Sequence, residues 1–408
     1  MQLRDYQIQN AEIGLKILKS LNLVYYVMSP RTGKTHTALY TAELFKTKKV
    51  LFITKKKAIS SIESDFKQTY YNYELRVINN ESLHTVSDDY FDLVIIDEGH
   101  RLGAFPKPSK TTKEIKQKYG HLPMIFLSGT PATESGSQWF HQFWVSKYSP
   151  FKQYVSFYKW AKDYVNITQK QIGAFKINDY THSIDEKIQK VIEPYLVKYT
   201  QEEAGFESKI NQNTICFPLS SKLQNIVNKL KKDLVIEGKN EIILADTSVK
   251  LMQKLHQIEN GTIKFESGNS MTLCTDKAHF IKQHFNNKKI AIFYYFIEEF
   301  ELLKQVFPQW TNDLELFKNS DVLTYIGQQY TNSLGVNLSS ADALVFYNFG
   351  YSGTNFIQSI DRLTTIDRKE NNVYFVFAKN SLTEKIYKTV KEKKNYSDSL
   401  FKKDSLYL

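Results

Sequence analysis

Short apolar runs alternate with amphipathic segments along most of the chain. Runs of four to seven apolar residues that end in small or polar residues indicate buried parallel strands, and apolar positions spaced three or four apart indicate helices. Because parallel strands need helical crossovers, this alternation predicts an α/β fold with two parallel sheets. The expected strands are 23–28, 50–54, 76–79, 93–96 and 124–127 in one half, and 289–295, 322–326, 343–347 and 373–377 in the other.

The middle of the chain has a helical pattern instead. Residues 138–198 are rich in aromatic and basic side chains, and such a stripe is more typical of a core than of a base-stacking platform. Helices are expected at 222–236 and 249–258, and the lysine-rich segment from Glu384 to the end is expected to be a solvated helix and tail.

A chain of 408 residues exceeds the size that a single core usually reaches, so we expect two domains. The first would cover 1–200, with a helical insertion at about 136–200. The second would cover 201–408, with helices at about 201–270, a sheet core at about 271–380 and a helical tail.

The turn after the first expected strand has the composition of a phosphate-binding loop. Backbone N–H groups at a strand-to-helix turn form a cradle for anions. Lys34 would lie against the β- and γ-phosphates of ATP, and the Thr35 hydroxyl would bind Mg²⁺. Met28 stands where the first glycine of the usual pattern is found, so the prediction depends on the surrounding strand and helix. The loop residues are Ser29, Pro30, Arg31, Thr32, Gly33, Lys34 and Thr35.

Two carboxylates follow the expected strand 93–96. Adjacent acids at the end of a buried strand are costly unless a cation is near. Asp97 would hold Mg²⁺, and Glu98 would orient and deprotonate the water that attacks the γ-phosphate. An acidic strand cap without catalytic function is the alternative.

Three further segments carry candidate chemistry. The Gln7 amide, about 25 residues before the phosphate loop, matches the hydrogen-bonding edge of adenine. Ser128 and Thr130 follow a strand, where small hydroxyl residues could sense the nucleotide state. The cluster Lys55, Lys56 and Lys57 also follows a strand and is either a contact to a nucleic-acid backbone or a solvated loop.

Charge and composition narrow the class of protein. The net charge of +11 suits a polyanionic partner, although a lysine-rich composition accounts for it equally well. Only six of the 54 basic residues are arginines, so a retained arginine indicates a need for a planar, forked donor. Two cysteines and nine histidines form no zinc pattern. Since no apolar run could be a signal peptide or a membrane span, we expect a soluble cytoplasmic protein.

These motifs, taken in order, resemble those of superfamily-two helicases and translocases, and most closely the SWI/SNF-type remodelling ATPases and their small phage and bacterial relatives. The resemblance covers nearly the whole chain. The matching segments are LRDYQ (3–7), SPRTGKT (29–35), VLFITKKKAISS (50–61), RVINNESLH (76–84), IIDEGHRLG (95–103), LSGTPATES (127–135), YLVKYTQEEAG (195–205), KLMQKLHQIENG (250–261), KKIAIFYYF (288–296), SLGVNLSSAD (333–342) and QSIDR (358–362).

The resemblance implies two RecA-like lobes, with ATP and Mg²⁺ in the cleft between them and nucleic acid across the top. It implies that Arg4 assists Gln7 at the nucleotide, and that Arg362 is an arginine finger oriented by Gln358. Further residues implied by motif position are His100, Gly335 and Asn337 for coupling, and Ser333 for nucleic-acid contact. The family pattern has a second arginine at position 365, where this chain has Thr365, and Arg368 lies about one helical turn later.

The expected function is an ATP-dependent DNA translocase or helicase acting on duplex DNA. We expect a monomer without membrane association, in the cytoplasm of a bacterial or phage-infected cell. A protein partner could direct it to its target. Two alternatives remain open from the sequence: an RNA helicase, and a nucleotide-gated DNA-binding protein with little motor activity.

Overall fold

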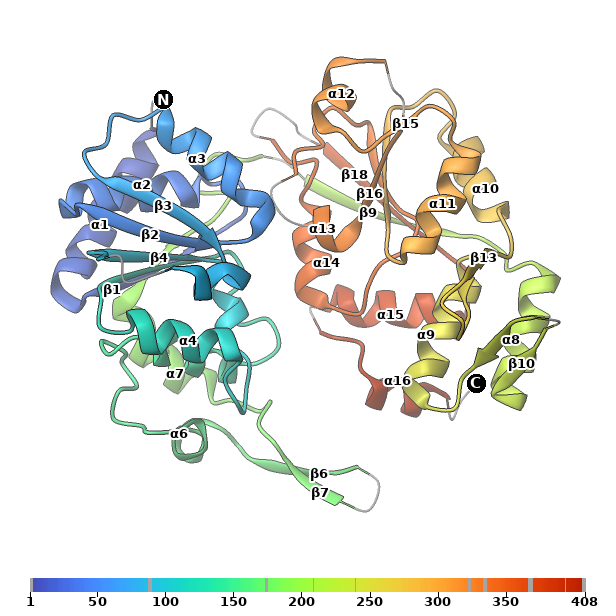
Figure 1. The fold of residues 1–408 in the computed structure, drawn as a ribbon, viewed down its shortest axis with the longest axis horizontal. Helices are drawn as coiled ribbons and strands as arrows, with labels where there is room; N and C mark the ends of the chain where they lie inside the picture. Colours follow the sequence, from blue (N-terminus) through green and yellow to red (C-terminus); the bar gives the residue numbers. More distant parts are fainter. Residues whose placement is uncertain are drawn as a thin grey trace. The chain divides into compact units, whose positions relative to one another are not determined.

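The computed structural model describes residues 3–86, 90–172, 175–207, 209–238, 240–321, 324–332, 336–365, 370–392 and 394–405. The chain divides into two compact units, Met1–Phe206 and Glu207–Leu408, which we call lobe 1 and lobe 2 (Figure 1). Each lobe is described by itself.

Lobe 1 is built on a six-stranded sheet in the order β3-β2-β4-β5-β1-β8, with every neighbouring pair parallel. The strands are β1 (Leu23–Met28), β2 (Lys49–Thr54), β3 (Glu74–Asn79), β4 (Leu93–Asp97), β5 (Met124–Ser128) and β8 (Leu196–Tyr199). The helices are α1 (Asp5–Leu21), α2 (Lys34–Phe45), α3 (Ile59–Lys67), α4 (Lys110–Tyr119), α5 (Trp139–Trp144), α6 (Phe157–Tyr164) and α7 (Asp185–Ile192), with 3-10 turns η1 (Lys56–Ala58), η2 (Asn80–Thr85), η3 (Gly99–Leu102), η4 (Gly136–Gln138) and η5 (Glu193–Tyr195).

The central strands of lobe 1 bury side chains on both faces, which is why they read as continuous apolar runs. Helices α1, α2 and α3 cover one face, where Leu18, Leu39 and Ile62 join the core. The opposite face is covered by α4 to α7, where Ile115 and Trp160 are buried. Figure 1 shows the two helical layers on either side of the sheet.

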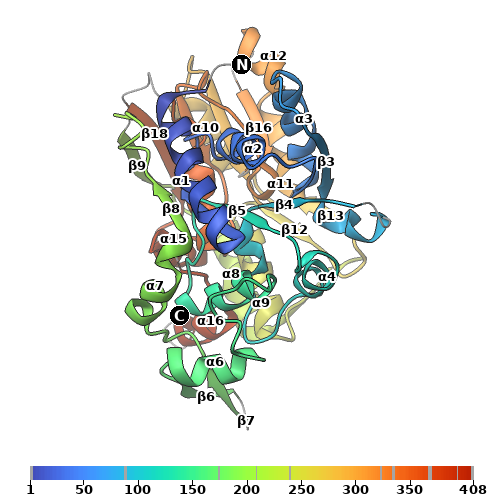
Figure 2. The same cartoon turned by 90° about the vertical axis from the view of Figure 1, so that its left-hand side faces the viewer.

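The segment 138–198 is not uniformly helical, which corrects the sequence prediction. It contains an antiparallel hairpin, β6 (Thr168–Ile172) with β7 (Phe175–Asp179), and it ends in β8, which pairs with β1. Figure 2 shows the hairpin extending from the end of lobe 1. The aromatic stripe packs as core, as predicted: Trp139, Phe143 and Trp160 are buried.

Lobe 2 has a second six-stranded parallel sheet, in the order β15-β16-β14-β17-β18-β9. Its strands are β9 (Lys209–Cys216), β14 (Ile290–Tyr294), β15 (Trp310–Thr311), β16 (Thr324–Gln328), β17 (Ala343–Phe346) and β18 (Glu370–Phe377), beside two hairpins, β10 (Val235–Glu237) with β11 (Ile242–Leu244) and β12 (Thr262–Lys264) with β13 (Ser270–Thr272). The helices are α8 (Ser221–Asp233), α9 (Ser248–Glu259), α10 (Asp276–His284), α11 (Ile297–Val306), α12 (Leu314–Asn319), α13 (Gln329–Asn332), α14 (Gly353–Ile360), α15 (Leu382–Lys391) and α16 (Asp398–Ser405).

Two sequence predictions for lobe 2 are wrong. The segment 201–270 is not purely helical, because β9 forms the edge of the sheet and three short strands lie among its helices. The C-terminal segment is not a solvated tail: Ile386 and Val390 of α15 and Phe401 of α16 are buried in the core. The apolar residues spaced about one helical turn apart in α15 therefore form a face packed against the core, and the helix is not solvated on all sides.

Each lobe is a mainly parallel sheet flanked by helices, which confirms the predicted pair of RecA-like lobes. In lobe 1 the connections after β2 and β4, which are neighbours, run toward opposite edges of the sheet. Such a divergence places a crevice at the carboxyl ends of the two strands. None of the helices in the described part of the chain is long and apolar enough to cross a bilayer.

Candidate active site

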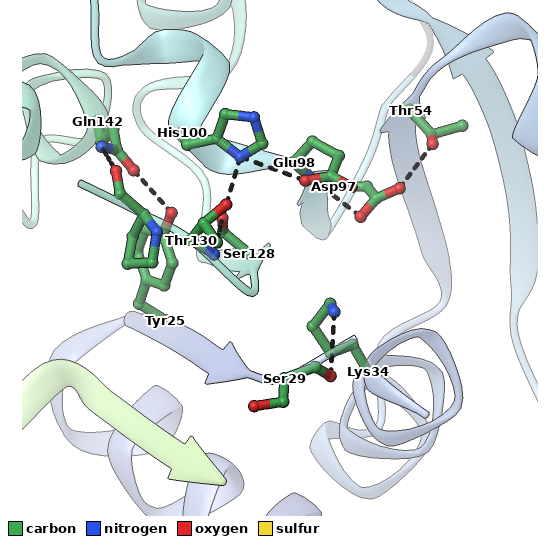
Figure 3. Close-up of polar contacts among 11 residues, drawn as sticks. Tyr25, Ser29, Lys34, Thr54, Asp97, Glu98, His100, Ser128, Thr130 and Gln142 are labelled. Carbon is green, nitrogen blue, oxygen red and sulfur yellow. Dashed lines mark hydrogen bonds and ion pairs between the residues drawn. The ribbon is translucent and has the colours of Figure 1, made fainter. Parts of the chain in front are cut away.

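The predicted phosphate loop connects the carboxyl end of β1 to the first turn of α2. Gly33 caps α2 with a left-handed φ of +82°, so Lys34 begins the helix at its positive end. The loop folds back on itself, because the Thr32 hydroxyl donates to the Ser29 carbonyl (2.8 Å). Lys34 Nζ lies 3.4 Å from the same oxygen (Figure 3). The Lys34 ammonium group and the first backbone N–H groups of α2 therefore lie at the same end of the loop, where the positive end of the helix favours an anion.

Gln7 lies directly against this loop. Its side chain is buried, Oε1 accepts from the Arg4 N–H (2.9 Å), and a Cβ atom added at Gly33 would collide with Nε2. Arg4 Nη1 donates to the Tyr6 hydroxyl (3.2 Å). Arg4 and Gln7, predicted to contact the nucleotide, are thus placed beside the phosphate loop.

The end of β8 supplies two loop partners that the sequence did not indicate. The Tyr199 carbonyl accepts from the Ser29 N–H (2.9 Å), and its ring stacks on Tyr6 with centroids 4.9 Å apart. Gln201 Nε2 donates to the Pro30 carbonyl (3.0 Å). The signals in the sequence were the short run Leu196–Tyr199, inside a segment predicted to be helical, and the family match of YLVKYTQEEAG (195–205). Neither signal indicated a contact to the loop.

Asp97 is the last residue of β4 and is held from two sides. Its Oδ2 accepts from the Thr54 hydroxyl at the end of β2 (2.8 Å), and its Oδ1 accepts from the Glu98 N–H (2.9 Å). Burial, followed by the charge of Glu98, raises the pKa of Asp97 to about 6. Thr54 and Asp97 lie where the connections after β2 and β4 diverge. Thr54 is a site residue that the sequence analysis missed.

Glu98 adopts a left-handed backbone conformation (φ +52°), which is uncommon for a residue with a Cβ atom. Its Oε2 lies 3.2 Å from His100 Nδ1, and the same nitrogen is 3.0 Å from the Ser128 hydroxyl (Figure 3). Ser128 Oγ also accepts from the Thr130 N–H (3.2 Å). Burial lowers the pKa of His100 although the neighbouring Glu98 carboxylate opposes this shift. Glu98, His100, Ser128 and Thr130 therefore form one connected chain.

A second chain of contacts ties the segment after β5 to helix α5. The Tyr25 hydroxyl donates to Gln142 Oε1 (2.6 Å), and Gln142 Nε2 donates to the carbonyls of Pro131 (2.7 Å) and Gln138 (3.0 Å). A Cβ atom at Gly99 would collide with the Tyr25 hydroxyl, so the turn after Glu98 also rests on this tyrosine. The sequence carried no signal for Tyr25 or Gln142 beyond their place in apolar segments.

The remaining predicted residues lie at the carboxyl end of β2 and in lobe 2. Lys55 is half-buried, whereas Lys56 and Lys57 are exposed on η1.

Gln358 of α14 and the following Arg362 are both buried, and Arg362 Nε donates to the Gln358 carbonyl (2.7 Å). The Asn337 side chain accepts from the Ser339 N–H (3.1 Å) and Thr365 is half-buried, whereas Ser333, Gly335 and Arg368 lie outside the described residues.

The oxygen atoms at this edge of lobe 1 fit Mg²⁺ bound together with a nucleotide. Within the described residues, no group of three or more His, Cys, Asp or Glu side chains is arranged to hold a metal ion. Mg²⁺ at nucleotide sites needs only one or two protein oxygens, with phosphates and water supplying the rest. Thr35 and Asp97 offer such oxygens, and a divalent cation would offset the cost of the adjacent acids Asp97 and Glu98.

Comparison with known proteins identifies the family of this chain. Among the curated proteins, no match was found. The Sulfolobus solfataricus SWI2/SNF2 ATPase core in complex with dsDNA is a similar solved structure, with 15% identity and a TM-score of 0.42 over 100% of this chain and 94% of that chain. The model of the SNF2-related domain matches residues 16–288, which is more than half of the chain and includes Lys34, Asp97 and Glu98. The chain therefore belongs to the SNF2-related domain family.

Proposed function

We propose that this protein is an ATP-dependent DNA translocase or helicase that acts on duplex DNA. The observation that carries the proposal is the meeting of three elements in lobe 1: an anion cradle with Lys34, a buried carboxylate at Asp97, and Glu98 linked to His100. This set matches the needs of phosphoryl transfer, which are positioning, charge neutralisation and an oriented water. Family membership supports the same reading.

In the proposed reaction, the backbone N–H groups of the loop and Lys34 hold the phosphates of ATP. Thr35 and Asp97 would hold Mg²⁺, which when bound neutralises charge on the β- and γ-phosphates. Glu98 orients the attacking water and accepts its proton. Arg4 and Gln7 contact the adenine, and Arg362 with Gln358 in lobe 2 provides the cation for the transferring phosphoryl group.

Coupling to DNA is proposed to pass through the Glu98–His100–Ser128 chain. A shift in the residues after β5 would change the contact between His100 and Glu98, and with it the orientation of the base. Asn337 and Gly335 are proposed to act in the same coupling from lobe 2, and Lys55, Lys56, Lys57 and Ser333 to contact the nucleic-acid backbone. The excess of basic residues supports a polyanionic partner.

The experiment is an ATPase assay at fixed salt, with no nucleic acid, single-stranded DNA, duplex DNA, forked DNA and duplex RNA. The expected result is a rate that rises at least ten-fold with duplex DNA and falls to background in Lys34→Ala and Glu98→Gln. The exposed residues Lys19 and Glu12 of α1 provide the matched controls Lys19→Ala and Glu12→Gln, which should keep the wild-type rate.

A rate that no nucleic acid raises would overturn the proposal. Stronger stimulation by duplex RNA than by duplex DNA would assign the motor to RNA. Nucleotide-dependent DNA binding without turnover would show a gated binding protein rather than a motor.

A further inference from the structure

Lobe 2 contains a groove of about 540 Å³ at the carboxyl edge of its sheet. It is lined by the segments that follow β14 and β17, together with residues of α9, α13 and α14. The chain leaves β14 toward β15 and leaves β17 toward β18, so two neighbouring strands send their connections to opposite edges of the sheet. This divergence is where open α/β sheets bind ligands. None of the residues proposed above for ATP binding or catalysis lines this groove.

The chemistry of the groove is that of amides and aromatic rings. Gln253 and Asn355 contribute side-chain amides, and Tyr295 and Tyr330 contribute rings, with Tyr330 52% exposed. Among the lining residues there is one lysine, Lys264, and one acid, Glu298, so the lining has no excess of positive charge for a phosphate group. Amides pair with the edges of bases and tyrosine rings stack on their faces. The lining therefore suits an uncharged, flat, hydrogen-bonding ligand.

The walls of the groove are held in place by buried hydrogen bonds. Gln329 accepts from the Gly350 N–H (2.7 Å), and a Cβ atom at Gly350 would collide with the Tyr295 ring. The Tyr351 hydroxyl is 2.9 Å from Nδ1 of the buried His256. The lack of a side chain at position 350 thus leaves room for the Tyr295 ring. Such fixed walls lower the entropy lost when a ligand binds.

We propose that this groove binds an unstacked nucleobase, with Tyr330 and Tyr295 against its face and the amides of Gln253 and Asn355 at its edge. The inference rests on the proposed nucleic-acid-directed function and adds base contacts to it. The base belongs either to a single strand or to a free nucleotide, and the experiment below separates these sources.

The test measures binding of the full-length protein to two labelled oligonucleotides of equal length at one salt concentration. One is oligo-dT and the other carries abasic sites throughout, so that only the phosphates and sugars are shared. We expect wild-type protein to bind oligo-dT about ten-fold more tightly than the abasic strand, since stacking contributes this much per base. Tyr330→Ala and Asn355→Ala should each lower the affinity for oligo-dT and leave the affinity for the abasic strand unchanged. Tyr70→Ala is the matched control, because Tyr70 in lobe 1 is 98% exposed.

The inference would be overturned if wild-type protein bound both oligonucleotides equally and showed no mononucleotide binding that Tyr330→Ala removes. It would also be overturned if Tyr330→Ala and Asn355→Ala each weakened the binding of both oligonucleotides equally. Binding of dTMP or AMP that Tyr330→Ala removes and Lys34→Ala does not would assign the groove to a free nucleotide. The urea midpoint of each variant reports whether lobe 2 remains folded, and Gln253→Ala provides a second variant at an exposed position. The binding measurements need no ATP turnover, so failure of the motor proposal would appear in the ATPase assay alone.

Discussion

The side-chain amide of Gln201 donates a hydrogen bond to the carbonyl of Pro30, 171 residues earlier in the chain, at 3.0 Å. Gln201 follows β8, immediately before the chain leaves lobe 1, and Pro30 is in the phosphate loop. The segment leading to lobe 2 therefore touches the loop proposed to hold ATP. A change in the loop conformation on nucleotide binding would therefore shift Gln201 at the start of that segment.

Gln201→Ala is expected to weaken ATP binding about five-fold, because one hydrogen bond contributes about 1 kcal/mol to the conformation of the loop. Titration with a fluorescent ATP analogue measures the change. Gln224→Ala on α8 is the control, since the Gln224 side chain is exposed and donates to Asn228 Oδ1 of the same helix. An unchanged dissociation constant for Gln201→Ala would refute a role in shaping the loop.

Gly33→Ala is expected to abolish ATP binding and to lower the melting temperature. The substitution forces a residue with a Cβ atom into a φ of +82° and drives that atom into the Gln7 amide. Gly268→Ala separates the two effects, because Gly268 has a φ of +93° and no described atom within 4 Å of the added Cβ. It should cost about 1 kcal/mol of stability from backbone strain and leave ATP binding intact. Calorimetry and nucleotide titration of both variants test this contrast.

The raised pKa of Asp97 predicts a pH-dependent stability in the absence of Mg²⁺ and nucleotide. Because the folded protein holds this proton up to about pH 6 and the unfolded chain releases it near pH 4, stability should fall as the pH rises through that window. Asp97→Asn removes the effect, so it should be more stable than wild type at pH 7.5, by on the order of 2 kcal/mol, and equal to it near pH 4. Urea unfolding in EDTA at several pH values measures the difference. If the difference in free energy of unfolding between Asp97→Asn and wild type were the same at all pH values, the raised pKa of Asp97 would be contradicted.

Asn348→Leu is expected to destabilise lobe 2 by about 3 kcal/mol or more. The buried Asn348 donates to Glu299 Oε1 (2.5 Å), and its Oδ1 contacts His256 Nε2 (2.7 Å), so leucine leaves two buried polar groups without this partner. Burial also raises the pKa of Glu299 to about 7 and lowers that of His256 to about 3. Urea unfolding measures the loss, and limited proteolysis should place new cleavage sites in lobe 2. Asn319→Leu, at a bond to the exposed Glu315, should change stability by less than about 0.5 kcal/mol.

The two sheets and three of their charged residues could be predicted from the sequence. Asp97 and Glu98 stand at the end of the apolar run of β4, and Lys34 opens the helix that follows the apolar run of β1. A run buried on both faces is a local signal that does not depend on distant residues. Edge strands lack that signal. The burial pattern of β9 alternates between exposed and half-buried positions, and the described side chains of the hairpin β6–β7 are exposed apart from Asp179, so both were assigned to helical segments.

What the sequence by itself determined was the order of strands and helices and the residues at the strand ends, because both follow from periodicity over a few positions. Only the tertiary structure decided which distant side chains complete the site. Thr54 is hydrogen-bonded to Asp97, 43 residues later in the chain. Tyr25 is hydrogen-bonded to Gln142, 117 residues later. Gln201 is hydrogen-bonded to Pro30, 171 residues earlier. Parallel pairing brings the carboxyl ends of strands together whatever the length of chain between them, so these contacts depend on strand order in the sheet and leave no local pattern in the sequence.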